Sequence, residues 1–285
     1  MIAKIYESAK SHVYRGIRKQ DGQPVILKVL KQDYPAPREL TRYKQEYSRL
    51  RGLNIHGAIE AYDLQLVKNT LVMILEDFGG SSLQSAIGER QFTLSEFLDL
   101  AIRITEILGE LHKAAPTQIV HKDINPANIV FNSTTGELKI IDFGIATILS
   151  RSNTSLKNPA VLEGTLPYMS PEPTGRMNRS LDYRTDFYSL GATFYQLLTH
   201  QLPFAATDAM ELVHCHIAKQ PLPPHELNRD IPQAVSAIVM KLLAKTAEER
   251  YQSASGIKAD LCEMFGCKQG ILVTAQTGII SRGTV

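Results

Sequence analysis

The residues of this chain whose types and spacing best suit chemistry lie in the octet 121–128, His-Lys-Asp-Ile-Asn-Pro-Ala-Asn, and the triplet 142–144, Asp-Phe-Gly. Pro126 fixes its own φ and disfavours the helical region for Asn125, so the octet cannot continue a helix that precedes it. The sequence therefore predicts a turn that presents polar side chains, among them the carboxylate of Asp123.

A small β unit is expected to link these two stretches. Residues 128–131 and 138–141 are short, apolar and β-prone, and the segment 132–136 between them is rich in turn formers and ends on Gly. Asn128 and Asp142 flank this predicted hairpin, so their side chains should lie near one point. Amide and carboxylate oxygens suit Mg²⁺, a hard ion that proteins usually hold through one or two such groups together with phosphate oxygens.

Length and composition exclude several classes of protein. With 285 residues the chain can bury a sizeable core in one or two domains, and its 44% hydrophobic and 21% charged residues are ordinary for a globular protein. A net charge of +2 gives no reason to expect nucleic acid or a membrane surface as a partner. Residues 1–7 lack the apolar segment of a leader, and no apolar run approaches the roughly 20 residues of a membrane span, so a cytoplasmic location is expected.

The cysteines favour free thiols. Cys215, Cys262 and Cys267 are too few and too late in the chain for a disulfide framework. No second cluster of Cys and His completes a zinc site.

A lysine inside an apolar run marks the N-terminal part of the chain. Residues 13–17 and 25–30 are predicted strands joined by the turn 20–23, and Lys28 interrupts the second strand. On the edge of a sheet, Lys28 would simply point to solvent. The other interpretation is a buried lysine with an acidic partner.

A helix predicted over residues 38–53 offers that partner. Its apolar residues fall along one helical face, at Leu40, Tyr43, Tyr47 and Leu50. Glu46 lies beside that face, four residues before Leu50. It is either the partner of Lys28 or an ordinary surface glutamate among lysines and arginines.

Taken in order, these motifs resemble those of protein kinases. The octet is similar to the catalytic loop H-R-D-x-x-x-x-N, the triplet to D-F-G, and Lys28 to the strand lysine of V-A-I-K. Residues 164–172, Gly-Thr-Leu-Pro-Tyr-Met-Ser-Pro-Glu, resemble the end of a Ser/Thr kinase activation segment and follow a polar stretch at 145–161 that is predicted to be mobile. By resemblance the chain is identified as a eukaryotic-type Ser/Thr protein kinase domain over nearly its whole length.

The resemblance implies an α+β, two-lobed fold, with a small, mainly antiparallel β N-lobe that carries one helix and a larger, mainly helical C-lobe. The kinase domain would span residues 1–265, with the N-lobe at about 1–77 and the C-lobe at about 78–265. Residues 266–285 would form a tail of unknown structure.

The same resemblance implies catalytic roles. Asp123 would orient a Ser or Thr hydroxyl of a protein substrate and accept its proton, with Thr165 in contact with Asp123. Asn128 and Asp142 would hold Mg²⁺, with Mn²⁺ as an alternative ion. Asn125 stands where Ser/Thr kinases usually carry a lysine that contacts the γ-phosphate, so slower chemistry is expected.

For ATP, the resemblance implies that Lys28 reaches the α and β phosphates and is set in place by Glu46. Backbone groups around Glu76 and Phe78, at the exit of a buried strand, would face the adenine. Leu75 would close the back of this pocket.

The phosphate-covering loop departs from the family. Counting back from Val13, which matches the valine of G-x-G-x-x-G-x-V, the three glycine positions fall on Tyr6, Ser8 and Ser11. Val13, Ser8 and Ser11 would border the nucleotide without the close backbone approach that glycine allows, and weaker nucleotide binding is expected.

Other positions carry structural expectations. Asp186 would accept N–H groups from the octet, and Glu172 would form an ion pair with Arg250. Lys122 replaces the arginine that clamps an activation-segment phosphate, and it lacks the bidentate fork, so control by phosphorylation of that segment is not expected.

Three functions stay open. The favoured one is an active Ser/Thr kinase, the second is a pseudokinase that acts as a nucleotide-binding or interaction module, and the third is a small-molecule phosphotransferase of the aminoglycoside kinase type. Residues 37–40, the octet and residues 174–178 also resemble the kinase domain that opens large bacterial, often cyanobacterial, signalling proteins. That resemblance implies downstream sensor or histidine-kinase modules as partners.

Overall fold

The computed structural model describes residues 3–8, 11–32, 35–114, 118–149, 165–172 and 181–266. Most of the stretch 145–161 that was predicted to be mobile, the loop 174–178 and the tail from Cys267 onward lie outside these residues. Cys215 and Cys262 are free thiols, as expected.

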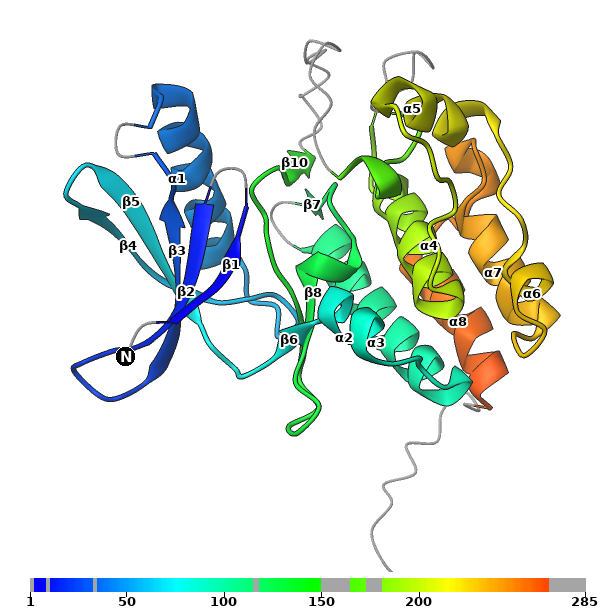
Figure 1. Cartoon of the computed structure of the whole chain (residues 1–285), viewed down its shortest axis with the longest axis horizontal. Helices are drawn as coiled ribbons and strands as arrows, with labels where there is room; N and C mark the ends of the chain where they lie inside the picture. Colours follow the sequence, from blue (N-terminus) through cyan, green and yellow to red (C-terminus); the bar gives the residue numbers. More distant parts are fainter. Residues whose placement is uncertain are drawn as a thin grey trace, which may run out of the picture.

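A five-stranded antiparallel sheet forms the N-terminal lobe, in the order β1-β2-β3-β5-β4 (Figure 1). Its strands are β1 (Ala3–Glu7), β2 (Ser11–Ile17), β3 (Pro24–Leu30), β4 (Ala61–Val67) and β5 (Thr70–Glu76). Because β3 lies between β2 and β5, Lys28 is on an interior strand, opposite Val13 and Met73. The interpretation of Lys28 as an edge-strand lysine is therefore wrong.

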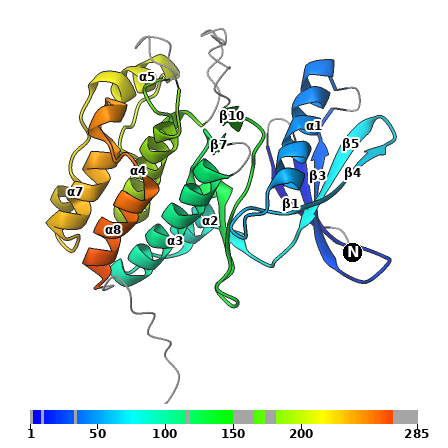
Figure 2. The same cartoon turned by 180° about the vertical axis from the view of Figure 1, so that it is seen from behind.

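One helix, α1 (Pro37–Gly52), packs on this sheet and contacts β4 and β5 (Figure 2). Pro37 occupies its first turn, where a missing N–H costs nothing. Tyr43, Glu46 and Leu50 form its buried face, because residues three and four apart project from the same side of a helix. The helix thus turns a glutamate toward the sheet.

The C-terminal lobe is mainly helical. Its helices are α2 (Leu83–Glu89), α3 (Leu94–Lys113), α4 (Arg184–Thr199), α5 (Ala209–Ala218), α6 (Pro224–Leu227), α7 (Gln233–Leu242) and α8 (Ala254–Phe265). Its short strands are β6 (Ser81–Ser82), β7 (Gln118–Val120), β8 (Ile129–Phe131), β9 (Leu138–Ile140) and β10 (Thr147–Leu149), which pair in the orders β6-β8-β9 and β10-β7. Single 3₁₀ turns span Pro126–Asn128, Leu166–Tyr168 and Ala247–Glu249. This α+β, two-lobed architecture confirms the expected fold class.

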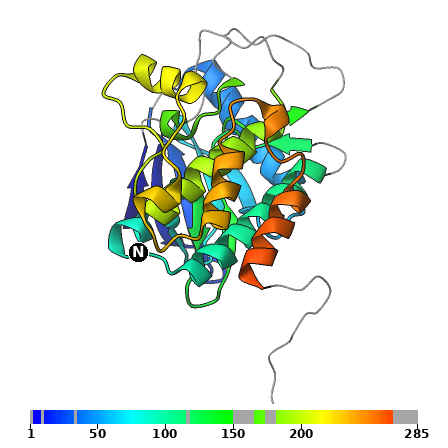
Figure 3. The same ribbon diagram turned by 90° about the vertical axis from the view of Figure 1, so that its right-hand side faces the viewer.

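The long helix α3 contacts α4, α8 and β7 in the helical lobe and leads to the octet. Thr93 and Glu96 form a capping box at its start, each side chain bonded to the backbone of the other residue. The orange-red α8 lies alongside α3 in the view of Figure 3, and Phe97 meets Phe194 of α4 edge-on with ring centroids 5.4 Å apart. Since α3 is packed on two sides and ends at Lys113, it fixes where β7 and the octet begin.

A buried histidine makes the stability of this lobe depend on pH. His216 on α5 is 1% exposed, and its Nδ1 lies 2.9 Å from the hydroxyl oxygen of Tyr188. Burial, reinforced by the charge of Lys245, lowers the pKa of His216 from 6.5 to about 4. When folding lowers the pKa of a histidine, the free energy of unfolding is unaffected at a pH above the pKa of the unfolded state. It decreases as the pH drops from the pKa of the unfolded state toward the pKa of the folded state, because protonation then favours the unfolded chain.

We therefore expect the free energy of unfolding to fall by up to about 3 kcal/mol as the pH drops from about 6.5 to about 4, in addition to losses from other groups. The measurement is urea unfolding at several pH values in this window. His216→Asn should be less stable at pH 7 but should have a flatter pH dependence. Equal pH slopes for the two proteins would contradict the assignment to His216.

Candidate active site

Lys28, Glu46 and Asp142 meet from separate elements of the fold, namely β3, α1 and the segment after β9. The Nζ of Lys28 lies 2.7 Å from Glu46 Oε1 and 3.1 Å from Asp142 Oδ1. The predicted pair of Lys28 and Glu46 is therefore present. An ammonium group has three N–H donors, so one remains after these two contacts.

Lys28 and the two carboxylates of this cluster shift one another's pKa values. Burial opposes the charge on Lys28, but the carboxylates of Asp142 and Glu46 outweigh it and raise the pKa of the lysine above its usual value. Burial raises the pKa of Glu46 to about 7 against the opposing effect of Lys28. For Asp142, burial also favours the neutral form, yet Lys28 outweighs it and the net pKa is lowered. At neutral pH the cluster thus presents a charged lysine beside an ionised Asp142.

The triplet that carries Asp142 has an unusual backbone. Asp142 has a φ of 76°, in the left-handed region, and its Oδ1 accepts a hydrogen bond from the N–H of Gly144 at 3.2 Å. A Cβ on Gly144 would lie 3.1 Å from Asp142 Oδ1 and 3.4 Å from Glu46 Oε2, so the glycine makes room for both carboxylates. Phe143 is fully buried and meets His121 edge-on, with ring centroids 4.8 Å apart. These contacts hold the left-handed conformation in place.

Asp186 on α4 anchors the start of the octet, as expected. Its carboxylate accepts hydrogen bonds from the backbone N–H of His121 at 2.9 Å and of Lys122 at 2.7 Å, and His112 Nε2 lies 2.8 Å away. Burial opposes the charge of Asp186, but its bond to His112 and the nearby backbone donors lower its pKa. The octet is thereby tied to the core helices α3 and α4.

N–H donors from the octet and from Thr165 surround the Asp123 carboxylate. Asn128 Nδ2 donates to the Asp123 backbone oxygen at 2.8 Å and to Oδ2 at 2.9 Å. The backbone N–H of Thr165 donates to Oδ1 at 3.0 Å, which is the contact expected between these two residues. Asn125 Nδ2 also reaches Oδ1, at 3.1 Å. The structure therefore brings together all three residues predicted to be catalytic, with Asn128 beside them.

The donor set near Asp142 fits a hard divalent ion. Because Asn128 Nδ2 is used on Asp123, the amide oxygen is the atom left for a metal. The N–H of Ile141 donates to the backbone oxygen of Asn128 at 2.9 Å. Because Asp142 follows Ile141 in the chain, this bond keeps Asn128 close to Asp142. The described residues contain no cluster of three or more His, Cys, Asp or Glu suited to a metal ion. One carboxylate and one amide oxygen suit Mg²⁺, which completes its shell with water and phosphate oxygens.

The turn between β1 and β2, where a kinase would have glycines, is closed by serine side chains. Ser8 Oγ accepts a hydrogen bond from the N–H of Ser11 at 2.9 Å and lies 3.0 Å from Ser11 Oγ. The N–H of Ser8 also donates to the Ser11 backbone oxygen at 2.9 Å. Tyr6 is 58% exposed on β1. Both serine hydroxyls therefore bond within the turn.

Residues 76–80, which leave β5, are held by contacts that the sequence did not suggest. Lys139 on β9 donates to both carboxylate oxygens of Glu76 at 2.7 Å. Asn132 Nδ2 donates to the backbone oxygen of Phe78 at 2.6 Å. The only available signal was Lys139 itself, which interrupts the apolar strand Leu-Lys-Ile in the way that Lys28 interrupts β3.

Arg15 on β2, in the five-stranded sheet, also contacts the segment 76–80. Its Nε lies 2.7 Å from Asp77 Oδ2. Leu75, at the end of β5, is buried. The N–H of Glu76 donates to the backbone oxygen of Glu60 at 3.0 Å. Of the backbone groups expected to face adenine, the N–H of Glu76 and the carbonyl of Phe78 are thus already bonded within the protein.

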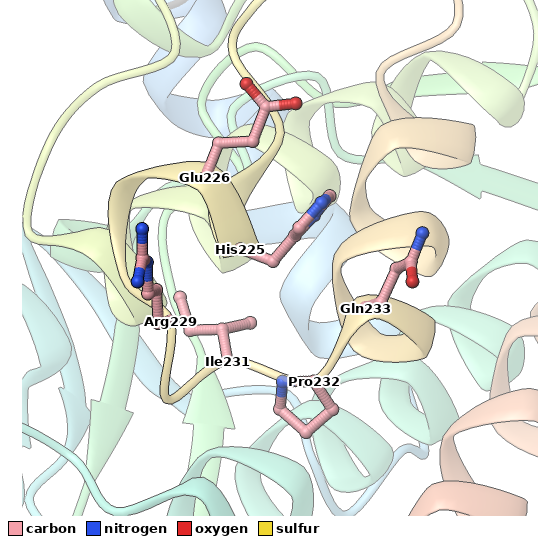
Figure 4. A pocket seen from close by; sticks show the side chains of 6 residues that line it. All are labelled: His225, Glu226, Arg229, Ile231, Pro232 and Gln233. Atoms are coloured by element: carbon pink, nitrogen blue, oxygen red, sulfur yellow. The ribbon is translucent and has the colours of Figure 1, made fainter.

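A separate hollow of about 540 Å³ lies at the turn between α6 and α7, on the side of the helical lobe away from the five-stranded sheet (Figures 1 and 4). It is lined by His225, Glu226, Arg229, Ile231, Pro232 and Gln233. None of the predicted site residues lines this hollow.

Comparison with known proteins decides the family. The family model of the protein kinase domain matches residues 3–261. The chain belongs to the protein kinase domain family. Among the residues described for this kinase domain, no helix is both long and apolar enough to cross a membrane.

Three similar curated proteins come from bacteria. A probable serine/threonine-protein kinase of Streptomyces coelicolor is 30% identical over 96% of this chain and 40% of its own length. The serine/threonine-protein kinase PknB of Mycobacterium tuberculosis is 30% identical over 88% of this chain and 40% of its own. A probable serine/threonine-protein kinase of Clostridium acetobutylicum is 31% identical over 87% of this chain and 37% of its own length. The chain thus spans about 40% of the length of these relatives.

Proposed function

We propose that this kinase domain transfers the γ-phosphoryl group of ATP to Ser or Thr hydroxyls of a protein substrate. The observation that carries the proposal is the junction of Lys28, Glu46 and Asp142 across three elements of the fold. Such a junction serves phosphoryl transfer, whose loose transition state needs positioning and charge neutralisation more than covalent chemistry. The names of the bacterial relatives support serine and threonine as acceptors.

In this reaction Asp123 orients the acceptor hydroxyl and accepts its proton. The hydroxyl oxygen forms a bond to the γ-phosphorus, the bond between that phosphorus and the β–γ bridging oxygen breaks, and ADP leaves. The remaining N–H of Lys28 binds the α and β phosphates, since Glu46 and Asp142 occupy its other two donors. Asn128 and Asp142 would hold Mg²⁺, or Mn²⁺, which when bound neutralises charge on the phosphate oxygens.

For the base, we propose that adenine uses the carbonyl of Glu76 and the N–H of Phe78. The other two backbone groups of these residues are bonded to Glu60 and Asn132. Val13, opposite Lys28 in the sheet, would cover the nucleotide together with the turn at Ser8 and Ser11. Leu75 would close the back of the pocket.

The test is transfer of labelled phosphate from γ-³²P-ATP with Mg²⁺ to casein and to the chain itself, followed by phosphoamino acid analysis. We expect label on Ser or Thr, and Asp123→Asn should slow transfer by about 10² to 10⁴-fold. Asp99→Asn, on the exposed surface of α3, is the matched control and should keep full activity. The proposal is overturned if the wild-type protein labels no protein with either ion, or labels only small alcohols.

A pseudokinase is the second candidate. It is favoured by the closed turn at Ser8 and Ser11 and by the neutral Asn125 in place of a lysine. In a thermal-shift assay with Mg²⁺-ATP, stabilisation without any transfer would indicate a nucleotide-binding module, and neither effect would indicate an interaction module.

Three further statements stay predictions from the sequence. They are the cytoplasmic location, the association with sensor or histidine-kinase modules, and the division into lobes at about residues 1–77 and 78–265 with a tail at 266–285.

A further inference from the structure

Asn125 makes more contacts than a turn residue needs. Its side chain is buried, with 3% of the residue exposed. Its Oδ1 accepts hydrogen bonds from the N–H of Ala127 at 2.9 Å and of Asn128 at 3.3 Å, and so caps the 3₁₀ turn Pro126–Asn128. Its Nδ2 lies 3.0 Å from the Asp123 backbone oxygen, 3.1 Å from Asp123 Oδ1 and 3.4 Å from Thr165 Oγ1.

These contacts leave the amide nothing to offer a phosphate. An amide NH₂ group has two N–H donors, and three protein oxygens already share them. A flip of the amide would place its oxygen against Asp123 and its NH₂ group against two backbone N–H groups, so the orientation is fixed from both ends. The sequence suggested a weak substitute for a phosphate-binding lysine, but the side chain is directed at Asp123.

We propose that Asn125 is a positioning residue that fixes the orientation of the Asp123 carboxylate and its position relative to Thr165. Asn125 does not bind the transferring phosphate. Asp123 Oδ1 is held by Asn125 and by the N–H of Thr165, while Oδ2 is held by Asn128. Rotation of the carboxylate would break bonds on both oxygens. This inference rests on the proposed function, because it assigns a role to a residue of the same site.

The simpler alternative is that Asn125 only caps the 3₁₀ turn. A serine at this position could cap the turn equally well, since its hydroxyl accepts from backbone N–H groups, but it is too short to reach the Asp123 carboxylate. Asn125→Ser thus keeps the cap and removes the contacts to Asp123 and Thr165, whereas Asn125→Ala removes both. Asn228→Ser is a matched control, because Asn228 is exposed and its Oδ1 caps a turn by accepting from the N–H of Asp230 at 2.9 Å.

The experiment measures kcat and KM for ATP, the melting temperature, and the affinities for ADP and for AMP-PNP, a nonhydrolysable ATP analogue, with Mg²⁺. For Asn125→Ser we expect kcat to fall by about 10- to 100-fold because a misplaced group costs rate at this scale. The melting temperature and the ratio of AMP-PNP to ADP affinity should stay at wild-type values. Asn125→Ala should lose the same activity and also melt lower, and Asn228→Ser should match wild type in all measurements.

Two results would overturn the inference while leaving the kinase function standing. A wild-type kcat in Asn125→Ser would mean that Asn125 only caps the 3₁₀ turn. A selective loss of AMP-PNP affinity would make it a ligand of the γ-phosphate. If the wild-type protein transfers no phosphate, the proposed function fails, and hydrogen exchange of the Thr165 amide then decides: faster exchange in Asn125→Ser supports the positioning role, and unchanged exchange refutes it.

Discussion

Asp142→Asn should lower the rate of phosphoryl transfer by a factor on the order of 10³, because it removes charge where the transferring group needs it neutralised. The carboxylate is ionised at neutral pH, since Lys28 lowers its pKa against the effect of burial. An asparagine keeps the shape of the side chain but not its charge. Among non-glycine residues, asparagine is one of those that best tolerate the left-handed φ of 76° at this position, so the backbone of the triplet should not change.

The measurements are labelled phosphate transfer and the melting temperature of the same preparation. If Asp142→Asn has the wild-type melting temperature but a lower rate of transfer, the loss of rate is due to the missing charge. In this variant Lys28 should keep its contact with Glu46, whose Oε1 lies 2.7 Å from the lysine Nζ in the wild type. Asp99→Asn serves again as the control for removal of a surface carboxylate. Unchanged turnover in Asp142→Asn would mean that Asp142 is not part of the transfer machinery.

The sequence predicted the pair of Lys28 and Glu46 because a charged residue that interrupts an apolar pattern leaves a local signal. Lys28 breaks an apolar strand and Glu46 lies beside the apolar face of the predicted helix, and the structure joins them at 2.7 Å. The same signal was present at Lys139 in β9, but its partner Glu76 lies 63 residues earlier in the chain. Nothing in either segment alone indicates that Lys139 on β9 lies within bonding distance of Glu76 at the end of β5, so only the tertiary arrangement reveals this pair.

Counting along a motif predicted positions better than it predicted the direction of side chains. Asn125 stands at the expected place in the octet, yet its amide is directed at Asp123 and at two backbone N–H groups. Ser8 and Ser11 stand at glycine positions, yet their hydroxyls bond each other. In both cases a short polar side chain next to a turn satisfies nearby backbone groups, a local preference that motif spacing does not capture.

A second large effect is expected at the predicted ion pair of Glu172 and Arg250, which is present and buried. Arg250 Nη2 lies 2.6 Å from Glu172 Oε1, and the two side chains are 0% and 4% exposed. The guanidinium also donates to the backbone oxygens of Ala244 at 2.8 Å and Arg184 at 3.0 Å, and it lies over the ring of Tyr188. Arg250 therefore joins the end of the activation segment to α4 and to the segment before α8.

Arg250→Ala should destabilise the fold by about 3–5 kcal/mol, because it leaves the charge of Glu172 buried without a partner. In a domain of this size that loss corresponds to a fall in melting temperature of roughly 10 °C. Arg90→Ala, at a pair whose arginine is 50% exposed, should leave the melting temperature nearly unchanged. The double variant Arg250→Met with Glu172→Leu should recover much of the stability, since a buried pair replaced by apolar side chains costs little. If Arg250→Ala melts like the wild type, or if the double variant is no more stable than Arg250→Ala, the charge of Glu172 is not what Arg250 compensates.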